Sequence, residues 1–425
     1  MIKVLQVLFL ILLVVSTGQA QIIFSGNVSV SGTVAGTILP SGFQGFGAVA
    51  TGGSTPCHVS NASQLTTCLA SSGKHIIFDA GGTYNGTQFN IPSNTFIDCF
   101  SAPSAVLFTG GAGSGGILAL SNNVSNIIIQ GCRIRGPGPG NTKGIMFFAS
   151  DDNVVPFNIV IDHCEISNVS DEDVGSAAHD VTLSWNLLGG PADSGGTLVK
   201  YGGYRWSIHH NFWSGLSGTD TRIPLVWAGN DSTANFSWNG QTIADVVSNI
   251  SGPGWQYGIT YIDDRTLANT SNVIDNFQGD ADVTPDHCKN ALLILPNPVE
   301  KHYIAGNANT CNPVNPNASA GQAAYGTTAE GDSGSINNVD SNKLTCPANN
   351  TGCQPSTPFP MPTITHADVC DVTARIAEWN SVIAQAGVIS KFADDSTAAA
   401  LRAHVTVPTT TIMNLAWNKQ TGTCP

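Results

Sequence analysis

Charge is scarce in this chain of 425 residues, since Asp, Glu, Lys and Arg together make up only 11% of it. Lys and Arg account for 16 positions against 29 for Asp and Glu, which gives a formal net charge of −13. Nucleic-acid binding relies on clustered positive charge, so this acidity argues against a nucleic-acid partner. If the chain handles a polyanion, a cation must be supplied locally by one of the few Arg or Lys side chains or by a metal ion.

A long apolar run is also missing beyond the first twenty residues, MIKVLQVLFLILLVVSTGQA. There, Lys3 precedes the apolar run Val4–Val15, and the small-residue site Gly18-Gln19-Ala20 follows it. This pattern predicts a signal peptide at residues 1–20 that is cut before Gln21. A membrane anchor is the alternative, although the run is short for a span. We therefore expect a secreted, extracellular protein with no membrane contact after cleavage.

Cysteines are present in number, but no CxxC pair occurs, which argues against a zinc ribbon or a thioredoxin motif. Eleven Cys suit an oxidising compartment, and the odd count leaves at least one thiol unpaired within the chain. Candidate pairs are Cys57/Cys68, Cys346/Cys353, Cys288/Cys311 and Cys370/Cys424. The 46 Gly and 22 Pro, with so little charge, favour many short strands and tight turns over helical bundles.

One nine-residue pattern repeats through the middle of the chain, with an aliphatic residue at its fourth position and Cys or Asn at its seventh. The seventh positions are Cys132, Cys164, Asn186, Asn211, Asn249, Asn276 and Asn307, and Cys99 precedes them. The variable spacing excludes a helical-hairpin repeat and favours a solenoid of strands joined by loops of free length. The sequence therefore predicts an all-β fold, a right-handed parallel β-helix of eight or more rungs. Its Asn column is expected to form an inward ladder, which leaves the glycosylation motif at Asn249 unmodified.

The ends of the solenoid need caps. A short helix at about Ser63–Ala70 and a first strand at His75–Asp79 are expected at the N-terminal end. Apolar residues three or four apart predict a second helix within residues 366–387, which ends at Gly387. We expect a β-helix domain over residues 21–390, with long loops, and a C-terminal tail, residues 391–425, that packs on it. The protein is expected to be a monomer.

Candidate chemistry lies on the strands that precede the ladder segments, which should stack into one sheet. These are residues 143–150, 171–176, 197–202, 222–229 and 257–263. Asp171 and Asp173 are two residues apart, so on a strand they share one face, and Val174 then faces the core. Paired carboxylates indicate a Ca²⁺ site, completed by further oxygen ligands. A solvated acidic turn is the alternative.

Positive charge appears close to this acidic pair. Arg222 opens the segment RIPLVWAG, and Lys200 lies one rung before it. Such a mixed-charge strip suits an anionic sugar, whereas an ordinary surface salt-bridge strip is the alternative. Trp227 is a candidate for stacking on a sugar ring, and packing under loops is the alternative.

The trio Asp162-His163-Cys164 has residue types used in catalysis, in metal binding and in disulfides. Asp162 and His163 precede the ladder turn, on a different sheet from the proposed strip, so we predict a structural role for them. Cys164 follows Cys99 and Cys132 in one column, which allows one disulfide between neighbours or three packed thiols.

Several of these segments together resemble the pectate lyase family and its pectin lyase relatives, the family-1 polysaccharide lyases. The resemblance spans about residues 90–390 and is carried by NIVIDHCEIS, DEDVGSAAHDVTLSWN, WSIHHNFW and TRIPLVWAG. Family members read V-W-I-D-H-C, D-x-x-x-D, H-H-N and R-x-P-x-x-R in the same order. The resemblance implies a parallel β-helix and cleavage of a uronate polymer by β-elimination.

The resemblance also implies roles for single residues. Arg222 matches the first Arg of R-x-P-x-x-R, which in the family removes the C5 proton of a galacturonate. Asp173, and less directly Asp171, match acids that bind Ca²⁺ in the family. This chain departs from the pattern where Trp227 replaces the second Arg and Gly196 falls where a Lys is expected, with Lys200 as a nearby substitute. An acid is also missing near Gly144, which leaves open a calcium-independent enzyme that acts on methyl-esterified polymer.

The leading hypothesis is a secreted lyase that acts on an anionic plant-type polysaccharide such as pectin or polygalacturonate. Arg222 is its catalytic candidate, Lys200 and Trp227 are its substrate contacts, and Asp171 and Asp173 are its Ca²⁺ ligands. A carbohydrate hydrolase that uses paired acids on the same fold is one alternative. A non-catalytic, glycan-binding or structural β-helix is another, because fold alone does not decide function.

Overall fold

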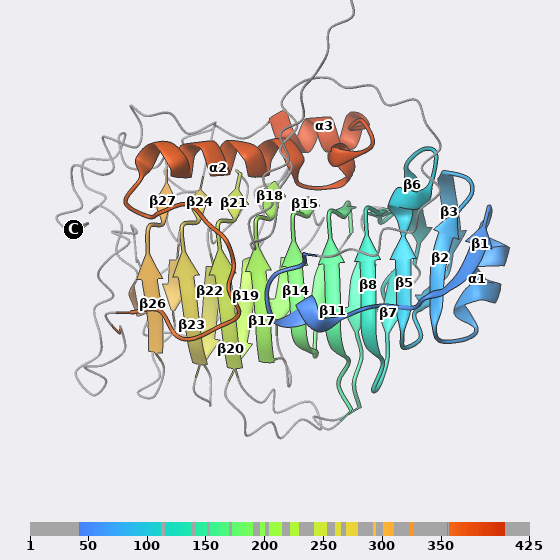
Figure 1. The fold of residues 1–425 in the computed structure, drawn as a ribbon, viewed down its shortest axis with the longest axis horizontal. Helices are drawn as coiled ribbons and strands as arrows, with labels where there is room; N and C mark the ends of the chain where they lie inside the picture. The colour runs from blue at the N-terminus through green and yellow to red at the C-terminus, as the bar shows by residue number, and fades with distance from the viewer. Residues whose placement is uncertain are drawn as a thin grey trace, which may run out of the picture. The chain divides into compact units, whose positions relative to one another are not determined.

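Three parallel β-sheets wind around one core in the computed structural model of the chain (Figure 1). The structure describes residues 42–111, 115–137, 142–150, 154–169, 172–189, 196–199, 204–214, 222–228, 242–252, 260–264, 269–278, 292–294, 301–309, 324–325, 355 and 357–403. From β5 onward the chain passes from the first sheet to the second, then to the third and back again. The predicted parallel β-helix is confirmed.

The sheets are named A, B and C here in the order in which the chain visits them within one rung. Among the described residues, sheet A has ten strands: β1 (Thr55–Val59), β2 (Lys74–Phe78), β5 (Thr95–Asp98), β8 (Ser125–Gln130), β11 (Phe157–Asp162), β14 (His179–Ser184), β17 (Tyr204–His209), β20 (Thr242–Val247), β23 (Asn269–Ile274) and β26 (Lys301–Ala305). Sheet B contains β3 (Gly82–Gly86), β6 (Val106–Gly110), β9 (Arg133–Arg135), β12 (Glu165–Ser167), β15 (Leu187–Gly189), β18 (Phe212–Ser214), β21 (Ile250–Ser251), β24 (Phe277–Gln278) and β27 (Ala308–Asn309). Sheet C contains β4 (Phe89–Asn90), β7 (Leu118–Leu120), β10 (Ile145–Phe147), β13 (Val174–Ser176), β16 (Gly196–Val199), β19 (Arg222–Ala228), β22 (Thr260–Asp264), β25 (Leu292–Ile294) and β28 (Ala324–Tyr325).

The register of sheet A reproduces the repeat read from the sequence. Ile129 pairs with Ile161, Ile161 with Leu183, and Leu183 with Ile208. The same column continues through Val246, Val273 and Ile304. All of these side chains are buried in one apolar core or its edge. Stacking therefore buries on each rung an apolar face that a single rung cannot bury alone.

The Asn column forms the predicted ladder at the turn between sheets A and B. From Asn186 to Asn276, each ladder residue donates its backbone N–H and its Nδ2–H to the Oδ1 of the next ladder Asn, at 2.8–3.0 Å. Each Nδ2 also donates to a backbone carbonyl of the preceding rung, as Asn249 does to the oxygen of Ile208 at 2.8 Å. The buried amides of the ladder are satisfied in this way, which avoids a large desolvation cost.

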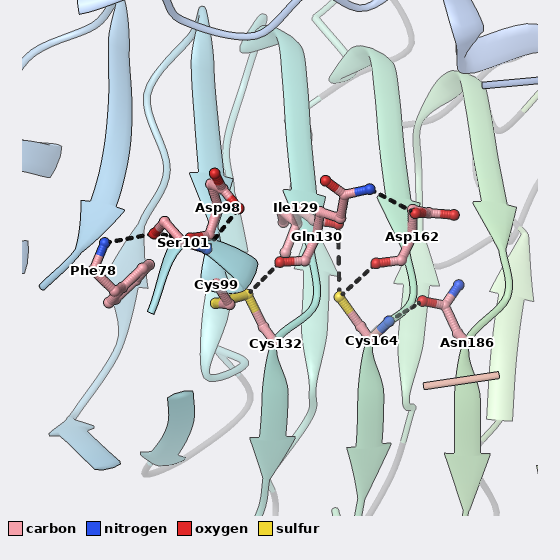
Figure 2. Close-up of a disulfide and its surroundings, with 10 residues drawn as sticks. All are labelled: Phe78, Asp98, Cys99, Ser101, Ile129, Gln130, Cys132, Asp162, Cys164 and Asn186. Carbon is pink, nitrogen blue, oxygen red and sulfur yellow. Dashed lines mark hydrogen bonds between the residues drawn. A yellow bond between two sulfur atoms is a disulfide. The ribbon is translucent and has the colours of Figure 1, made fainter. Parts of the chain in front are cut away.

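Cys99, Cys132 and Cys164 occupy the position of the ladder Asn on the rungs before Asn186 (Figure 2). Cys99 and Cys132 form a disulfide with a Cα–Cα distance of 5.1 Å, and Cys164 is a buried free thiol. Cys57 and Cys68 are also joined, as predicted. Cys370 is disulfide-bonded, whereas its predicted partner Cys424 and the predicted pairs Cys288/Cys311 and Cys346/Cys353 lie outside the described residues.

Helices cap the first rung and line one corner. The helix α1 (Ala62–Leu69) confirms the predicted cap, and Asn61 begins it by accepting a hydrogen bond from the N–H of Gln64. The sequence missed β1, which pairs with β2. The predicted second helix is α2 (Val372–Gln385), and Gly387 follows it at a φ of 82°. The buried face of α2 packs on sheet B through an apolar cluster that contains Trp379, Val382, Leu187, Phe212, Ile250 and Phe277.

Short segments cover sheets A and B. The 3-10 helix η1 (Phe46–Val49) lies on sheet A, where the N–H of Gly47 donates to Oγ1 of Thr182 at 2.9 Å. Further along sheet A, Phe359 exchanges two hydrogen bonds with the Asn272 side chain. After α2, the chain forms η3 (Val388–Ser390) and α3 (Ser396–Ala403), and the carbonyl of Leu401 accepts from Ser214 of sheet B. The 3-10 helix η2 (Cys99–Ser101) follows β5. No helix in the described part of the chain is both long and apolar enough to span a membrane.

Candidate active site

The strands that were predicted to carry the chemistry lie side by side in sheet C. The order β10, β13, β16, β19 and β22 is continuous in that sheet, and each neighbouring pair is parallel. The prediction that these segments stack into one sheet is therefore confirmed. Sheet C brings Gly144 and Arg222, about 80 positions apart in the chain, into one stack with rung steps of about 4.8 Å.

The register places the acidic and the basic candidate in one column. Arg222 pairs directly with Gly196. Val174 pairs with Ile145 of β10 and with Thr197 of β16. Asp173, one residue before Val174, therefore lies opposite Gly144 on one neighbouring rung and opposite Gly196 on the other. The column therefore reads Gly144, Asp173, Gly196 and Arg222. Since Arg222 lies two rungs beyond Asp173, their backbones are about 10 Å apart along the stack.

A glycine is required at the first position of this column. A Cβ added at Gly144 would collide with the carbonyl oxygen of Asp173 and with the side chain of Ile166. An acid at this position would therefore need the backbone to move. The absence of a carboxylate on this rung, noted from the sequence, has a steric cause.

Asp173 is fully buried, directly before β13. Neither of its carboxylate oxygens has a hydrogen-bond partner among the described residues. Desolvation by burial, and next the charge of Glu172, raise the pKa of Asp173 well above its usual range. A solvated acidic turn is thus excluded for Asp173. Asp173 and its neighbour Val174 are both buried, so the inward–outward alternation of side chains begins only after Asp173. An unpaired buried carboxylate is costly, and a cation would remove that cost.

Sequence reasoning missed an ion pair beside Asp173. Lys143 pairs with Glu172, and both side chains are largely buried. The N–H of Gly144 donates to the carbonyl of Glu172 at 2.9 Å, which sets Lys143 and Glu172 on neighbouring rungs. Aligning the rung KGI over EDV would have shown the two opposite charges in one column.

Arg222 and Trp227 are placed by the backbone of β19. The register between β16 and β19 shifts by one residue, since Gly196 pairs with Arg222 but Leu198 pairs with Leu225. β19 therefore has one more residue than β16 over this stretch. This irregularity contains Pro224, which has no N–H to give to a ladder. Such bulges often lie next to active sites, where they redirect a side chain. Trp227 pairs with Asp263 of β22. Lys200 and Asp171 lie outside the described residues.

A complete metal centre is not present among the described residues, where no group of three or more His, Cys, Asp or Glu side chains comes together. Ca²⁺ prefers six to eight oxygen ligands. The two unpartnered oxygens of Asp173 have the right chemistry for Ca²⁺, but by themselves they fall short of its shell.

The trio Asp162-His163-Cys164 lies on sheet A and its turn, as predicted. The Asp162 carboxylate accepts hydrogen bonds from Ser184 at 2.6 Å and from Gln130 at 2.9 Å, and it contacts Nδ1 of His163 at 2.7 Å. Burial would raise the pKa of Asp162, but the charge and hydrogen bond of His163 and the other donors outweigh burial and lower it. These contacts tie three rungs together and give Asp162 a structural role.

Comparisons with known proteins find matches among solved structures. No protein family model and no curated protein matches this chain. Solved pectate lyases resemble it in structure. Pectate lyase II from Xanthomonas campestris is 15% identical, with 83% of this chain and 100% of that chain covered and a TM-score of 0.45. A pectate lyase from Bacillus sp. N165, solved with trigalacturonate, is 16% identical, with 82% and 99% covered and a TM-score of 0.48. A pectate lyase from Paenibacillus sp. 0602 is 12% identical, with 85% and 98% covered and a TM-score of 0.47.

The resemblance to pectate lyases expected from the motifs is thus found among solved structures as well. At these identities it concerns the fold and assigns no activity to this chain.

Proposed function

We propose that this protein is a secreted polysaccharide lyase that cleaves a uronate polymer of the pectate or pectin type by β-elimination. The observation that carries the proposal is the column in sheet C, where the register sets Arg222 two rungs beyond the buried carboxylate of Asp173. A cationic and an anionic residue in one column suit a substrate whose every sugar carries a carboxylate.

The reaction needs a proton removed and a negative charge stabilised. The C5 proton passes to a base supplied by solvent, and the electron pair of the C5–H bond forms the double bond between C4 and C5. The C4–O bond then breaks, and the departing oxygen takes a proton from water. Arg222 is the catalytic candidate for this step. A guanidinium remains charged at all ordinary pH values, so stabilisation of the developing negative charge is the role that its chemistry supports best. Lys200 is proposed to contact a substrate carboxylate and Trp227 to stack on a sugar ring.

Asp171 and Asp173 are the proposed ligands for Ca²⁺. The ion, when bound, supplies positive charge to the uronate carboxylate and so acidifies the neighbouring C5 proton. The support from this chain is the buried carboxylate of Asp173, whose two oxygens have no hydrogen-bond partner among the described residues. Asp173 has to be joined by Asp171, by water and by substrate oxygens to complete a shell.

The cover of the other sheets supports a site on sheet C. Sheet A lies under η1 and the segment around Phe359, and sheet B lies under α2 and α3. A solenoid with a filled core has no internal pocket, so a long polymer has to bind on an outer face. Sheet C is the sheet that carries the candidate column, and we propose it as the polymer-binding face.

Product analysis tests the proposal. Purified mature protein is incubated with polygalacturonate, methyl-esterified pectin and other uronans, with added Ca²⁺ and with a chelator. The expected result is unsaturated uronate end groups, detected by ultraviolet absorbance and mass spectrometry. Saturated products with a new reducing end would instead indicate a hydrolase, and binding without turnover would indicate a glycan-binding protein. Either result would contradict the lyase proposal.

A further inference from the structure

Asn-x-Ser/Thr motifs are frequent in this chain, and the structure sorts those that it describes into two groups. The chain carries them at Asn27, Asn61, Asn85, Asn123, Asn168, Asn230, Asn235, Asn249, Asn269, Asn317 and Asn349. The side-chain surroundings are described for Asn61, Asn85, Asn123, Asn168 and Asn249. Since the N-terminal segment predicts secretion, each of these motifs is a potential N-glycan acceptor.

The hydrogens of the side-chain amide decide which of these residues can carry a glycan. Attachment at Nδ2 replaces one of its two hydrogens and leaves Oδ1 as an acceptor. Asn249 is only 3% exposed, and its Nδ2 donates to the oxygen of Ile208 at 2.8 Å and to Oδ1 of Asn276 at 2.9 Å. Both hydrogens are in use and no space is left, so a glycan at Asn249 is incompatible with the ladder.

The other four side chains are exposed, and their hydrogen bonding is compatible with a glycan. Asn61 uses only Oδ1, which accepts from the N–H of Gln64 at 3.0 Å, so a glycan on Nδ2 leaves the cap of α1 intact. Asn168 donates one long hydrogen bond, at 3.4 Å, to the carbonyl of Gly136 and retains a second hydrogen. Within the described residues, Asn85 and Asn123 donate no side-chain hydrogen bond at all.

Their place in the rung is also consistent. Asn85 lies near the end of β3 and Asn168 directly after β12, where the chain leaves sheet B for sheet C. Asn123 lies between β7 and β8, where the chain leaves sheet C for sheet A. These corners point outward from the solenoid and border sheet C without lying on the strands β13–β19.

We propose that the secreted protein is N-glycosylated at Asn61, Asn85, Asn123 and Asn168, and that Asn249 is unmodified. Three of these glycans then lie beside sheet C, at Asn85 and Asn168 where the chain enters it from sheet B and at Asn123 where the chain leaves it for sheet A. Asn168 lies on the same rung as Asp173, and Asn61 lies apart from sheet C at the start of α1.

The test is glycopeptide mapping of the full chain, secreted from eukaryotic cells with its own leader. Peptide N-glycosidase converts each occupied Asn to Asp, and the sites are read by mass spectrometry. The expected result is conversion at the four exposed positions and none at Asn249. Glycan at Asn249 in the folded, secreted protein, or no glycan at any of the four, overturns the proposal.

A matched set of variants keeps every Asn in place. Ser63→Ala, Thr87→Ala and Ser125→Ala each remove one motif but leave its Asn, and each is expected to reduce the mass by a single glycan. Unchanged mass in all three variants contradicts the assignment. The outcome is independent of lyase activity, because glycan occupancy is measured on the protein itself.

Discussion

The backbone N–H of Cys164 donates a hydrogen bond to Oδ1 of Asn186, 2.8 Å away on the next rung (Figure 2). The thiol of Cys164 lies 3.6 Å from the carbonyl oxygen of Ile129 on the preceding rung. Asn186 makes the equivalent contact one rung later, where its Nδ2–H donates to the carbonyl of Ile161, the residue that pairs with Ile129. Cys164 therefore occupies the first ladder position with a thiol in place of an amide. Burial raises its pKa to about 12, which keeps it protonated and unreactive in the folded protein.

Removal of Cys99 should move the disulfide by one rung. Cys132 and Cys164 lie on neighbouring rungs, as the 2.9 Å hydrogen bond from Glu165 N–H to the carbonyl of Cys132 shows. Their expected Cα–Cα distance of about 5 Å lies in the range that a disulfide spans. Cys99→Ser, folded under oxidising conditions, is expected to contain a Cys132–Cys164 disulfide in non-reducing peptide maps. Two free thiols at these positions would contradict the column geometry, and the added change Cys164→Ser is the control that must abolish the new bond.

Loss of one ladder amide should destabilise the whole stack. Asn211→Ala removes the acceptor of the Asn186 N–H and Nδ2–H and leaves further buried groups unpaired. We expect the free energy of unfolding to fall by about 3 kcal/mol, since each orphaned buried polar group costs about 1–3 kcal/mol. Urea unfolding measures the change. Asn90→Ala, at an exposed strand position, is the control, and its free energy of unfolding is expected within about 0.5 kcal/mol of that of the parent. An equal loss of stability in the two variants would argue against the ladder.

Asp245 should make stability fall as pH rises. It lies on sheet A between Ser207 and Asn272, and its Oδ1 has no hydrogen-bond partner in the described part of the chain. Burial raises the pKa of Asp245 to about 7, against the opposing hydrogen bond of Asn272. Because the folded pKa lies above the unfolded one, the stabilising contribution is full below about pH 4 and is lost as the pH rises through about 7.

Asp245→Asn is therefore expected to be more stable than the parent by about 2–4 kcal/mol at about pH 8, and about equally stable at about pH 4. Urea unfolding at both pH values measures this difference. Asp79→Asn changes a half-exposed carboxyl that pairs with His58 and serves as the control. If the gain from Asp245→Asn is the same at both pH values, the carboxyl does not titrate as described.

Asp173 should couple stability to Ca²⁺. In chelator, Asp173→Asn is expected to melt at a higher temperature than the parent, because the amide buries no unpaired charge. Added Ca²⁺ is expected to raise the midpoint of the parent, since a ligand that binds only the folded state stabilises it, and to leave that of the variant unchanged. A calcium response that is equal in both proteins, or absent from both, would remove Asp173 from the metal site. Asp79→Asn is the control that should keep the response of the parent.

The sequence predicted the parts of the fold in which residues repeat from rung to rung. It did not predict contacts that occur only once in the molecule. The Ile and Asn columns fix the rung register because every rung contributes one member, and the same register predicts that Gly196 lies one rung before Arg222. The strand Thr55–Val59 belongs to no repeat and escaped notice. The hydrogen bond of Gly47 to Thr182 spans 135 positions and leaves no periodic signal.

The candidate column shows the same division. Its strands were predicted from their place before the ladder segments, and its four residues were matched to positions of the family motif. The burial of Asp173 was not predicted, because the chain bends before β13 and strand alternation does not apply there. The Lys143–Glu172 pair was missed because both residues lie just before their strands, and the rungs were not aligned there.

The central claim is that Arg222 on sheet C performs the elimination, and the initial rate of unsaturated-uronate formation by Arg222→Ala tests it most directly. Arg205→Ala is the matched control, since Arg205 is a partly exposed arginine that pairs with Asp180 on sheet A. The account predicts a loss of at least about a hundredfold for Arg222→Ala, the scale set by removal of one electrostatic stabiliser, with Arg205→Ala close to the parent. If Arg222→Ala retains the rate of the parent on the substrate that the parent cleaves, Arg222 is not the catalytic residue and the site lies elsewhere.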